Sequence, residues 1–360
     1  MRLVWGTVDA IGHERDDLQR LDVTADGTDS PSVALCYPAL SGRCEPGDRV
    51  LLNTTAVDLS LGTGGAHVVV TRVPAGEREA RGVALDDPSG GHVMKLRYTP
   101  LQRDVMAVEA PESPGHALLE NAVDVGGMPV VCCGLHSHVA LIAAAIKERS
   151  RHARVAYLMT DEAALPLALS DVVAHAVEQR MLDLTVTCGQ AFGGMLEAVN
   201  LYSGLVAARV VGEADIAIVA IGPGVVGTGT VLGHGGIAQG EAINAVAAVG
   251  GRAVASLRLS FADARERHRG VSHHTITALT RIALAPALVA VPELDPVLQG
   301  LVDDDLRSAG VWERHERVFL SSVLPEMHGV PLRSMGRAPE DDPAFFLAAS
   351  AAGAVAADLL

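Results

Sequence analysis

The chain has 360 residues, of which 49% are hydrophobic, 20% are charged and only 3% are aromatic. This length and hydrophobic content predict two folded domains and argue against intrinsic disorder. The formal net charge of −15 disfavours general binding to nucleic acid, because an acidic surface repels phosphate backbones.

Residues 1–110 are expected to form a small β-rich domain. Short apolar runs alternate there with turn residues, at 3–5, 33–35, 50–52 and 67–70. Pro46, Gly47 and Asp48 form a clear turn signal before one of these runs. Regular short strands with tight turns favour a barrel or a sandwich. The Gly- and Pro-rich stretches 86–91 and 111–115 predict connections, with one further strand between them at 93–101.

Residues 116–360 predict an α/β domain with a mostly parallel, doubly wound sheet. The predicted strands are 129–133, 154–159, 184–188, 216–221, 253–259, 288–291 and 317–321. The predicted helices are 138–149, 167–181, 195–211, 238–249, 274–284, 296–309 and 343–360. Continuously apolar strands that alternate with helices are typical of a parallel sheet covered on both faces.

A glycine-rich loop follows the fourth of these strands, at residues 222–236. Ligands of open parallel sheets bind beyond the carboxyl ends of the strands, so this loop is a candidate site. Its candidate ligand-binding residues are Gly222, Gly224, Gly227, Thr228 and Gly229. The loop matches G-x-G-x-x-G, but further glycines separate it from the next helix, which makes a dinucleotide site a weak alternative. We expect a backbone nest for a phosphate or carboxylate, and the remaining alternative is a loop that only packs.

An arginine- and histidine-rich loop follows the fifth strand. Arg265, Arg267 and Arg269 could bind an anion through their guanidinium groups. Ser272 is a candidate N-cap for a helix that starts near His273, and it joins the candidate ligand-binding residues. The alternative is a solvated loop whose charges pair with one another.

The chain has 14 histidines, several of which fall in strand-end loops. Imidazole is the natural acid or base near neutral pH, so His136, His234 and His273 are the candidate catalytic residues. Transition metals also favour imidazole, and His138, His268 and His274 lie in the same loops. No H-E-x-x-H motif is present, so the sequence assigns no metal ligand.

The five cysteines and the N-terminal sequence bear on the compartment. No signal peptide is visible, and no apolar run reaches the ~18 residues that a membrane span needs. The odd cysteine number then favours reduced thiols, a cytoplasmic protein and no membrane partner. Cys188 is expected to be a small buried residue and not a nucleophile, since no Cys/His signature surrounds it.

Four segments together resemble a bacterial family known as domain of unknown function number 3866. They are residues 91–102 (GHVMKLRYTPLQ), 134–137 (GLHS), 222–244 and 267–275 (RHRGVSHHT). The resemblance covers nearly the whole chain and implies no activity and no cofactor. It draws attention to Lys95, Arg97 and Tyr98, which could close over the site or form a surface strand of the first domain.

Three functions remain open from the sequence. The first is an enzyme that acts on a small anionic metabolite, either phosphorylated or a carboxylate, held by the glycine-rich and arginine loops. The second is a metal-dependent hydrolase that uses the histidines. The third is a non-catalytic binding or scaffold protein, in which the β-rich domain mediates assembly, for example into a homo-oligomer. The sequence identifies no cofactor.

Overall fold

A computed structural model describes residues 2–58, 65–77, 91–97, 101–321, 323–330 and 332–360. The chain divides into two compact units. The first consists of Met1–Gly90 and Leu96–Arg103, and the second of Gly91–Lys95 and Asp104–Leu360. Of the connection predicted at residues 86–91, all but Gly91 lies outside the described residues, and so does Tyr98.

The first unit is a closed five-stranded barrel with strand order β1-β2-β3-β5-β4. Its strands are β1 (Leu3–Glu14), β2 (Gln19–Ala25), β3 (Pro31–Cys36), β4 (Arg49–Asn53) and β5 (Ala66–Val73). Two short helices, α1 (Pro38–Ser41) and α2 (Thr55–Asp58), belong to the same unit. All barrel pairings are antiparallel except that of β3 with β5. The small β-rich domain predicted for this region is confirmed, and of the two predicted forms, barrel and sandwich, it is the barrel.

The interior of the barrel is filled by alternate side chains of its strands. Strand β2 was not anticipated, although Gln19, Leu21, Val23 and Ala25 are its buried positions and alternate with more exposed ones. This period of two is the usual mark of a half-buried strand, but polar Gln19 and the short apolar side chains weaken it. Cys36 and Cys44 lie in this core with their sulfurs 3.6 Å apart.

The second unit is built on an eight-stranded, all-parallel sheet with order β11-β10-β9-β12-β8-β13-β16-β17. The central strands are β8 (Pro129–Cys132), β9 (Val155–Thr160), β10 (Leu184–Cys188), β12 (Ile216–Ile221) and β13 (Arg252–Ser256). The others are β11 (Leu196–Ala198), β16 (Leu288–Pro292) and β17 (Glu316–Leu320). The predicted parallel, doubly wound sheet is confirmed.

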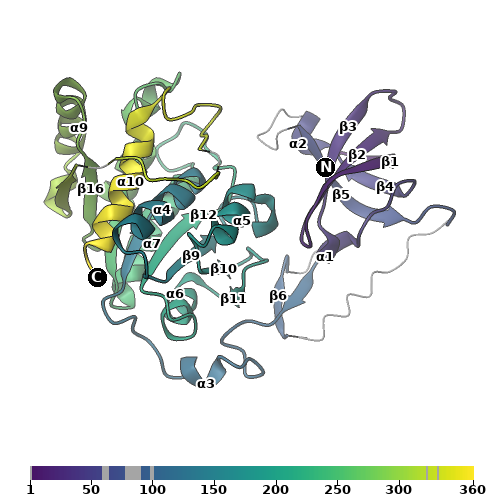
Figure 1. Cartoon of the computed structure of the whole chain (residues 1–360), viewed down its shortest axis with the longest axis horizontal. Helices are drawn as coiled ribbons and strands as arrows, with labels where there is room; N and C mark the ends of the chain where they lie inside the picture. Colours follow the sequence, from purple (N-terminus) through teal and green to yellow (C-terminus); the bar gives the residue numbers. More distant parts are fainter. Residues whose placement is uncertain (1, 59–64, 78–90, 98–100, 322, 331) are drawn as a thin grey trace. The chain divides into compact units, whose positions relative to one another are not determined.

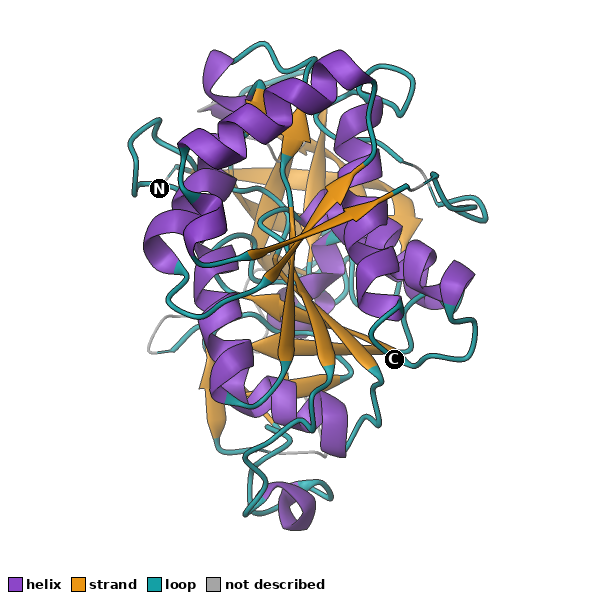
Figure 2. Cartoon of the chain, turned by 90° about the vertical axis from the view of Figure 1, so that its left-hand side faces the viewer, coloured by secondary structure: helices purple, strands orange, loops and turns teal. Residues whose placement is uncertain are grey.

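Helices cover both faces of this sheet, as Figure 2 shows for the strands that run between two helical layers. The α4, α5 and α10 helices pack on one face, at Val139–Arg149, Asp171–Glu178 and Pro343–Ala357. The other face carries α6 (Leu201–Val210), α7 (Ala238–Ala248), α8 (His273–Thr277) with a following π-turn (Ala278–Ile282), and α9 (Pro296–Ser308). A short helix α3 (His116–Leu119) precedes β8 (Figure 1). In the described part of the chain, every helix falls short of the length and hydropathy that a membrane crossing requires.

Three predicted elements were wrong in part. The helix expected at 195–211 contains the edge strand β11 before α6 begins. The helix expected at 167–181 is a 3-10 turn (Leu167–Leu169) followed by the shorter α5. The strand expected at 253–259 ends at Ser256, and β14 (Leu259–Ser260) pairs with β15 (Gly270–Val271) in a separate small sheet.

The strand predicted at 93–101 is also shorter than expected. Among the described residues of this range, β6 (Val93–Lys95) forms and ends before Leu96, and it pairs with β7 (Arg103–Val105). Lys95 neither closes over the site nor lies on a surface strand of the first unit, because its side chain is fully buried in the second unit. Its ammonium group donates to the carbonyls of Gly189 and Ala198 and pairs with Glu197 at 3.3 Å.

Candidate functional site

The strand order places the candidate loops near the point where the connections between strands change direction along the sheet. From β8 the chain moves through α4 to β9, towards the β11 edge. From β12 the chain moves through α7 to β13, and from β13 it moves through α8 to β16, both times towards the β17 edge and on the opposite face. The loops that leave the adjacent strands β8 and β13 therefore diverge, which is where open parallel sheets bind ligands.

The glycine-rich loop after β12 folds back on itself as a small hairpin. Gly227 and His234 form an antiparallel bridge. The amide of Thr228 donates to the carbonyl of Gly233 at 2.9 Å, and its hydroxyl contacts the same carbonyl. Several amides of this loop therefore form hydrogen bonds within the hairpin and do not point outward as a row of N–H groups. The hairpin instead holds His234 in place.

The other glycines of this loop have separate structural reasons. Gly222 is buried, and a Cβ at this position would lie 2.3 Å from the carbonyl oxygen of Ala164. Gly224 and Gly229 adopt positive φ angles of 86° and 79°, which L side chains rarely adopt. Gly227 packs against His274, whose Nε2 would lie 3.4 Å from a Cβ added there. The loop after β12 is therefore in contact with the loop after β13.

Ser272 starts α8, as its sequence position predicts. Its side-chain oxygen accepts a hydrogen bond from the amide of His274 at 3.3 Å. The same hydroxyl lies 2.7 Å from Nδ1 of His268. Ser272 thereby fixes the first turn of α8, and with it the places of His273 and His274.

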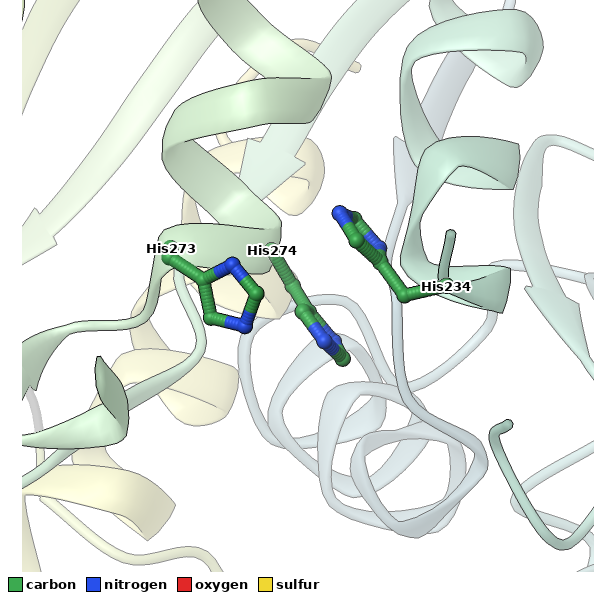
Figure 3. Close-up of side chains that lie close together, drawn as sticks. All are labelled: His234, His273 and His274. Carbon is green, nitrogen blue, oxygen red and sulfur yellow. The ribbon is translucent and has the colours of Figure 1, made fainter. Parts of the chain in front are cut away.

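Four imidazoles meet between the two loops. His234 stacks on His274 with ring centroids 3.9 Å apart and planes inclined by 6°. His273 lies 4.4 Å from His274 and 5.3 Å from His234 between centroids. His268 lies 4.9 Å from His274. Figure 3 shows His273 and His274 at the start of one helix and His234 on the facing segment. We call His234, His268, His273 and His274 the histidine cluster.

The surroundings keep this cluster uncharged. Burial, followed by the neighbouring His234 and Arg258, lowers the pKa of His274 to about 2. Burial and then Arg258 lower the pKa of His268 to about 3. The pKa values of His234 and His273 are also lowered, chiefly by burial. At neutral pH each ring therefore offers one N–H and one lone pair.

A buried arginine that the sequence analysis missed supports the cluster. Arg258 lies between β13 and β14, inside what was expected to be one strand, and it donates from Nη1 to Nδ1 of His274 at 3.2 Å. Its other terminal nitrogen lies 3.9 Å from Asp263. Burial and then the charge of Arg265 lower the pKa of Arg258 to about 10, so the guanidinium remains protonated at neutral pH. The available signal was a single arginine inside the otherwise uncharged run 253–259 that was expected to be one strand.

The three arginines named from the sequence differ in their availability. Arg265 forms a two-pronged ion pair with Asp263, at 3.0 and 2.9 Å, which holds the pKa of that carboxyl well below its usual range. Arg269 donates to the carbonyl of Asp263 at 2.9 Å. Arg267 is exposed and has no hydrogen bond or ion pair to the described residues. Among the three, Arg267 is the guanidinium available to a ligand.

The charge of this rim is positive although the chain is acidic. The rim carries five guanidinium groups against three carboxylates: Arg258, Arg265, Arg267, Arg269 and Arg337 against Asp263, Glu266 and Asp342. Arg337 belongs to the segment after β17 and lies 3.3 Å from Asp342 and 3.6 Å from Asp263. Segments from two distant parts of the chain thus share one charged network.

His136 does not belong to the histidine cluster. Its Nε2 bonds to the hydroxyl of Ser170 at 2.6 Å and its Nδ1 to that of Tyr157 at 3.1 Å. Both ring nitrogens are therefore engaged on the α4 side of the sheet. Burial lowers its pKa to about 4. His138, two residues later, is buried and bonds through Nδ1 to Ser256 at 3.1 Å, at the end of β13.

A separate hollow of about 390 Å³ lies beyond β9 and β10, between the starts of α6 and α7. Its lining includes three carboxylates, those of Asp161, Glu162 and Glu241. Cys188 also lines it, but burial raises the pKa of this thiol and keeps it protonated. The negative charge of this hollow would repel an anion, so the arginine-lined rim is the better place for one.

The comparisons with known proteins reach the family and go no further. No curated protein and no solved structure matches the chain. Residues 33–353 match the family described as "Protein of unknown function (DUF3866)", which spans parts of both units, the glycine-rich loop and the whole histidine cluster. The chain of 360 residues therefore belongs to the DUF3866 family of proteins.

Proposed function

We propose that this protein is an enzyme that acts on a small anionic metabolite, bound beyond the carboxyl ends of β12 and β13. The observation that carries the proposal is the meeting of two loops distant in sequence. His234 from the glycine-rich loop stacks at 3.9 Å on His274 from the arginine-rich loop. Side chains far apart on the surface would instead have favoured a non-catalytic scaffold.

The charge of the rim supports an anionic substrate. Arg267 has no partner among the described residues and stands in a network with an excess of guanidinium groups. Arg258 adds a buried positive charge directly behind His274. Guanidinium groups bind phosphate and carboxylate oxygens through paired hydrogen bonds, and these are the two substrate classes that we propose.

The neutral imidazoles supply the acid and base groups. A neutral histidine accepts a proton through one nitrogen and donates through the other. Nδ1 of His234 and Nε2 of His273 are both buried and have no hydrogen-bond partner, so they are available to a reacting group. A bound anion would raise the low pKa values of these rings, because it offsets the positive charge that holds them down.

A thermal-shift screen tests the proposal. The probes are inorganic phosphate and a panel of phosphorylated and carboxylate metabolites. A true ligand at about 100 times its dissociation constant should stabilise the fold by about 2.7 kcal/mol. We expect Arg267→Gln to lose most of this shift, because it removes the available guanidinium group at the rim.

Arg151→Gln is the matched control. Arg151 is also an exposed arginine, but it lies in the turn before β9, at the amino end of the sheet. The same change in charge there should leave the shift intact. No shift with any probe would contradict the proposal, and so would equal losses in the two variants.

A further inference from the structure

We propose that His234, His273 and His274 bind a divalent transition-metal ion, with zinc as the best-suited class. One ligand nitrogen from each residue can be chosen so that all three lie within 4.8 Å of one another. Two of the residues open α8, and the third closes the glycine-rich hairpin (Figure 3). Three imidazoles with an open fourth position are a common donor set of catalytic zinc.

The hydrogen bonds of the cluster leave lone pairs without partners. Nε2 of His234 lies 3.0 Å from the carbonyl of Val231, so it carries the proton and Nδ1 carries the lone pair. That Nδ1 is buried and without a partner, as is Nε2 of His273. A buried polar atom without a partner costs free energy, and two in one cluster point to a ligand that takes their lone pairs. A backbone carbonyl that orients the remote nitrogen is typical of metal-binding histidines.

The glycines beside the cluster keep space at these nitrogens. A Cβ added at Gly236 would lie 3.1 Å from Nδ1 of His234 and 3.1 Å from Nδ1 of His274. Gly227 stands in the same way 3.4 Å from Nε2 of His274. Neither glycine has a positive φ angle, so backbone conformation does not explain them. A Cβ at Gly236 would also lie 2.9 Å from the Cβ of His274, so the lack of side chains at both positions lets the two loops approach each other and leaves the imidazole nitrogens uncovered.

Metal binding would require a rearrangement of the stacked pair. The planes of His234 and His274 are nearly parallel, so one ring has to turn about its Cβ–Cγ bond before both lone pairs point to one ion. If His274 used Nδ1, it would also give up the hydrogen bond from Arg258. The guanidinium would then be free to bind an anion beside the metal. This coupling rests on the proposed function, whereas the metal site itself rests on the histidines.

The test uses the full chain without a histidine tag, freed of metal by a chelator and dialysis. Zinc binding is measured by calorimetry, and cobalt is the spectroscopic probe, since its visible absorption reports nitrogen ligands in a tetrahedral field. We expect about one ion per chain. His234→Gln and His273→Gln should each weaken binding by at least a hundredfold, because loss of a ligand should exceed the ~10–100-fold effect of outer partners. His152→Gln, which changes an exposed histidine before β9, should bind like the unmodified chain.

His273→Gln decides the test if His234→Gln does not fold. His273 is only partly buried and makes no hydrogen bond to the described residues, so its replacement should leave the fold intact. Less than a tenth of an equivalent bound, or equal binding by all variants, would overturn the metal site. If an anion stabilises the protein in the thermal-shift screen but the protein binds no zinc, the metal site alone is refuted. Zinc binding without any anion effect would refute the proposed function alone.

Discussion

His234 and His274 can stack face to face only because both rings are neutral. Two imidazolium cations with ring centroids 3.9 Å apart in a partly buried site would repel strongly. Burial and the nearby guanidinium of Arg258 keep both pKa values low, and this holds the cluster in its compact form at neutral pH. The residues that prepare the site for a ligand also make it sensitive to acid.

We therefore expect stability to fall as the pH drops from about 6.5 to about 4. The pKa of His136 is lowered to about 4 and that of His138 to about 3, mainly by burial, so the unfolded chain takes up protons before the folded chain does. Each such histidine lowers the free energy of unfolding by up to about 1.4 kcal/mol per pH unit within this window. Raised pKa values of Glu162 and Glu197 act in the opposite direction, but these two carboxyls stand against seven described histidines whose pKa values are lowered.

Urea unfolding at a series of pH values measures this slope. His138→Gln should make this slope shallower, because the unfolded chain then takes up about one proton fewer between pH 6.5 and 4. A flat profile over this range in the unmodified chain would contradict the assignment of neutral buried histidines.

Lys95 and Glu197 form the other notable pair of charged residues. Lys95 is fully buried, and its ammonium group is satisfied by two carbonyls and the Glu197 carboxylate. We expect Lys95→Met to destabilise the second unit by about 3–5 kcal/mol, since it leaves a largely buried carboxylate without its counter-charge. The double change Lys95→Met with Glu197→Leu should recover most of this loss. Chemical unfolding of the three proteins gives both values, and an unchanged single variant would refute the buried pair.

At the scale of secondary-structure elements, small side chains allow close contact between helices. Helix α10 is rich in alanine and buried along nearly its whole length against α4 and the sheet. A Cβ added at Gly353 would lie only 2.4 Å from the backbone oxygen of Ile142 in α4. This glycine therefore sets how closely the two helices approach, although glycine inside a helix is intrinsically unfavourable.

Two glycine-to-alanine changes with opposite expected signs test this packing. Gly353→Ala should destabilise the protein by about 1–3 kcal/mol, because the overlap with α4 outweighs the gain in helix propensity. Gly300 lies on the exposed side of α9, with nothing within 4 Å of an added Cβ. Gly300→Ala should stabilise by about 0.5–1 kcal/mol. Thermal unfolding distinguishes the two, and stabilisation by Gly353→Ala would show that α10 packs differently.

Strong apolar runs fixed several elements from the sequence alone. The bounds of β10 and β12 agree with the predicted ranges, because β12 is a continuous apolar run, β10 is rich in β-branched residues, and each lies between an aspartate and a glycine. The three-residue strand β11 was missed, since Leu196, Glu197 and Ala198 all favour a helix and only pairing with β10 makes them a strand. Arg258 was missed for a similar reason, because nothing local shows that β13 ends two residues before it.

At the scale of the whole molecule, alternation of strands and helices predicted the parallel sheet but not the strand order. The insertion of β12 between β9 and β8 depends on contacts between residues about 60 to 90 positions apart, which no local pattern encodes. That insertion brings the loop after β12 close to the loop after β13. The sequence could name His234, His273 and Ser272 from their strand-end positions, whereas the partners Arg258 and Asp263 emerged only from the folded chain.

The imidazole nitrogen spectrum of protein labelled with ¹⁵N-histidine tests most directly whether the two loops form one ligand site. His234, His273 and His274 are assigned by single substitutions, and the sample is titrated with zinc and then with inorganic phosphate. The account predicts that the signals of all three rings move together, while those of exposed His152 and of internally bonded His136 stay in place. Signals that do not move, or that move for His234 independently of His273 and His274, would contradict a shared site.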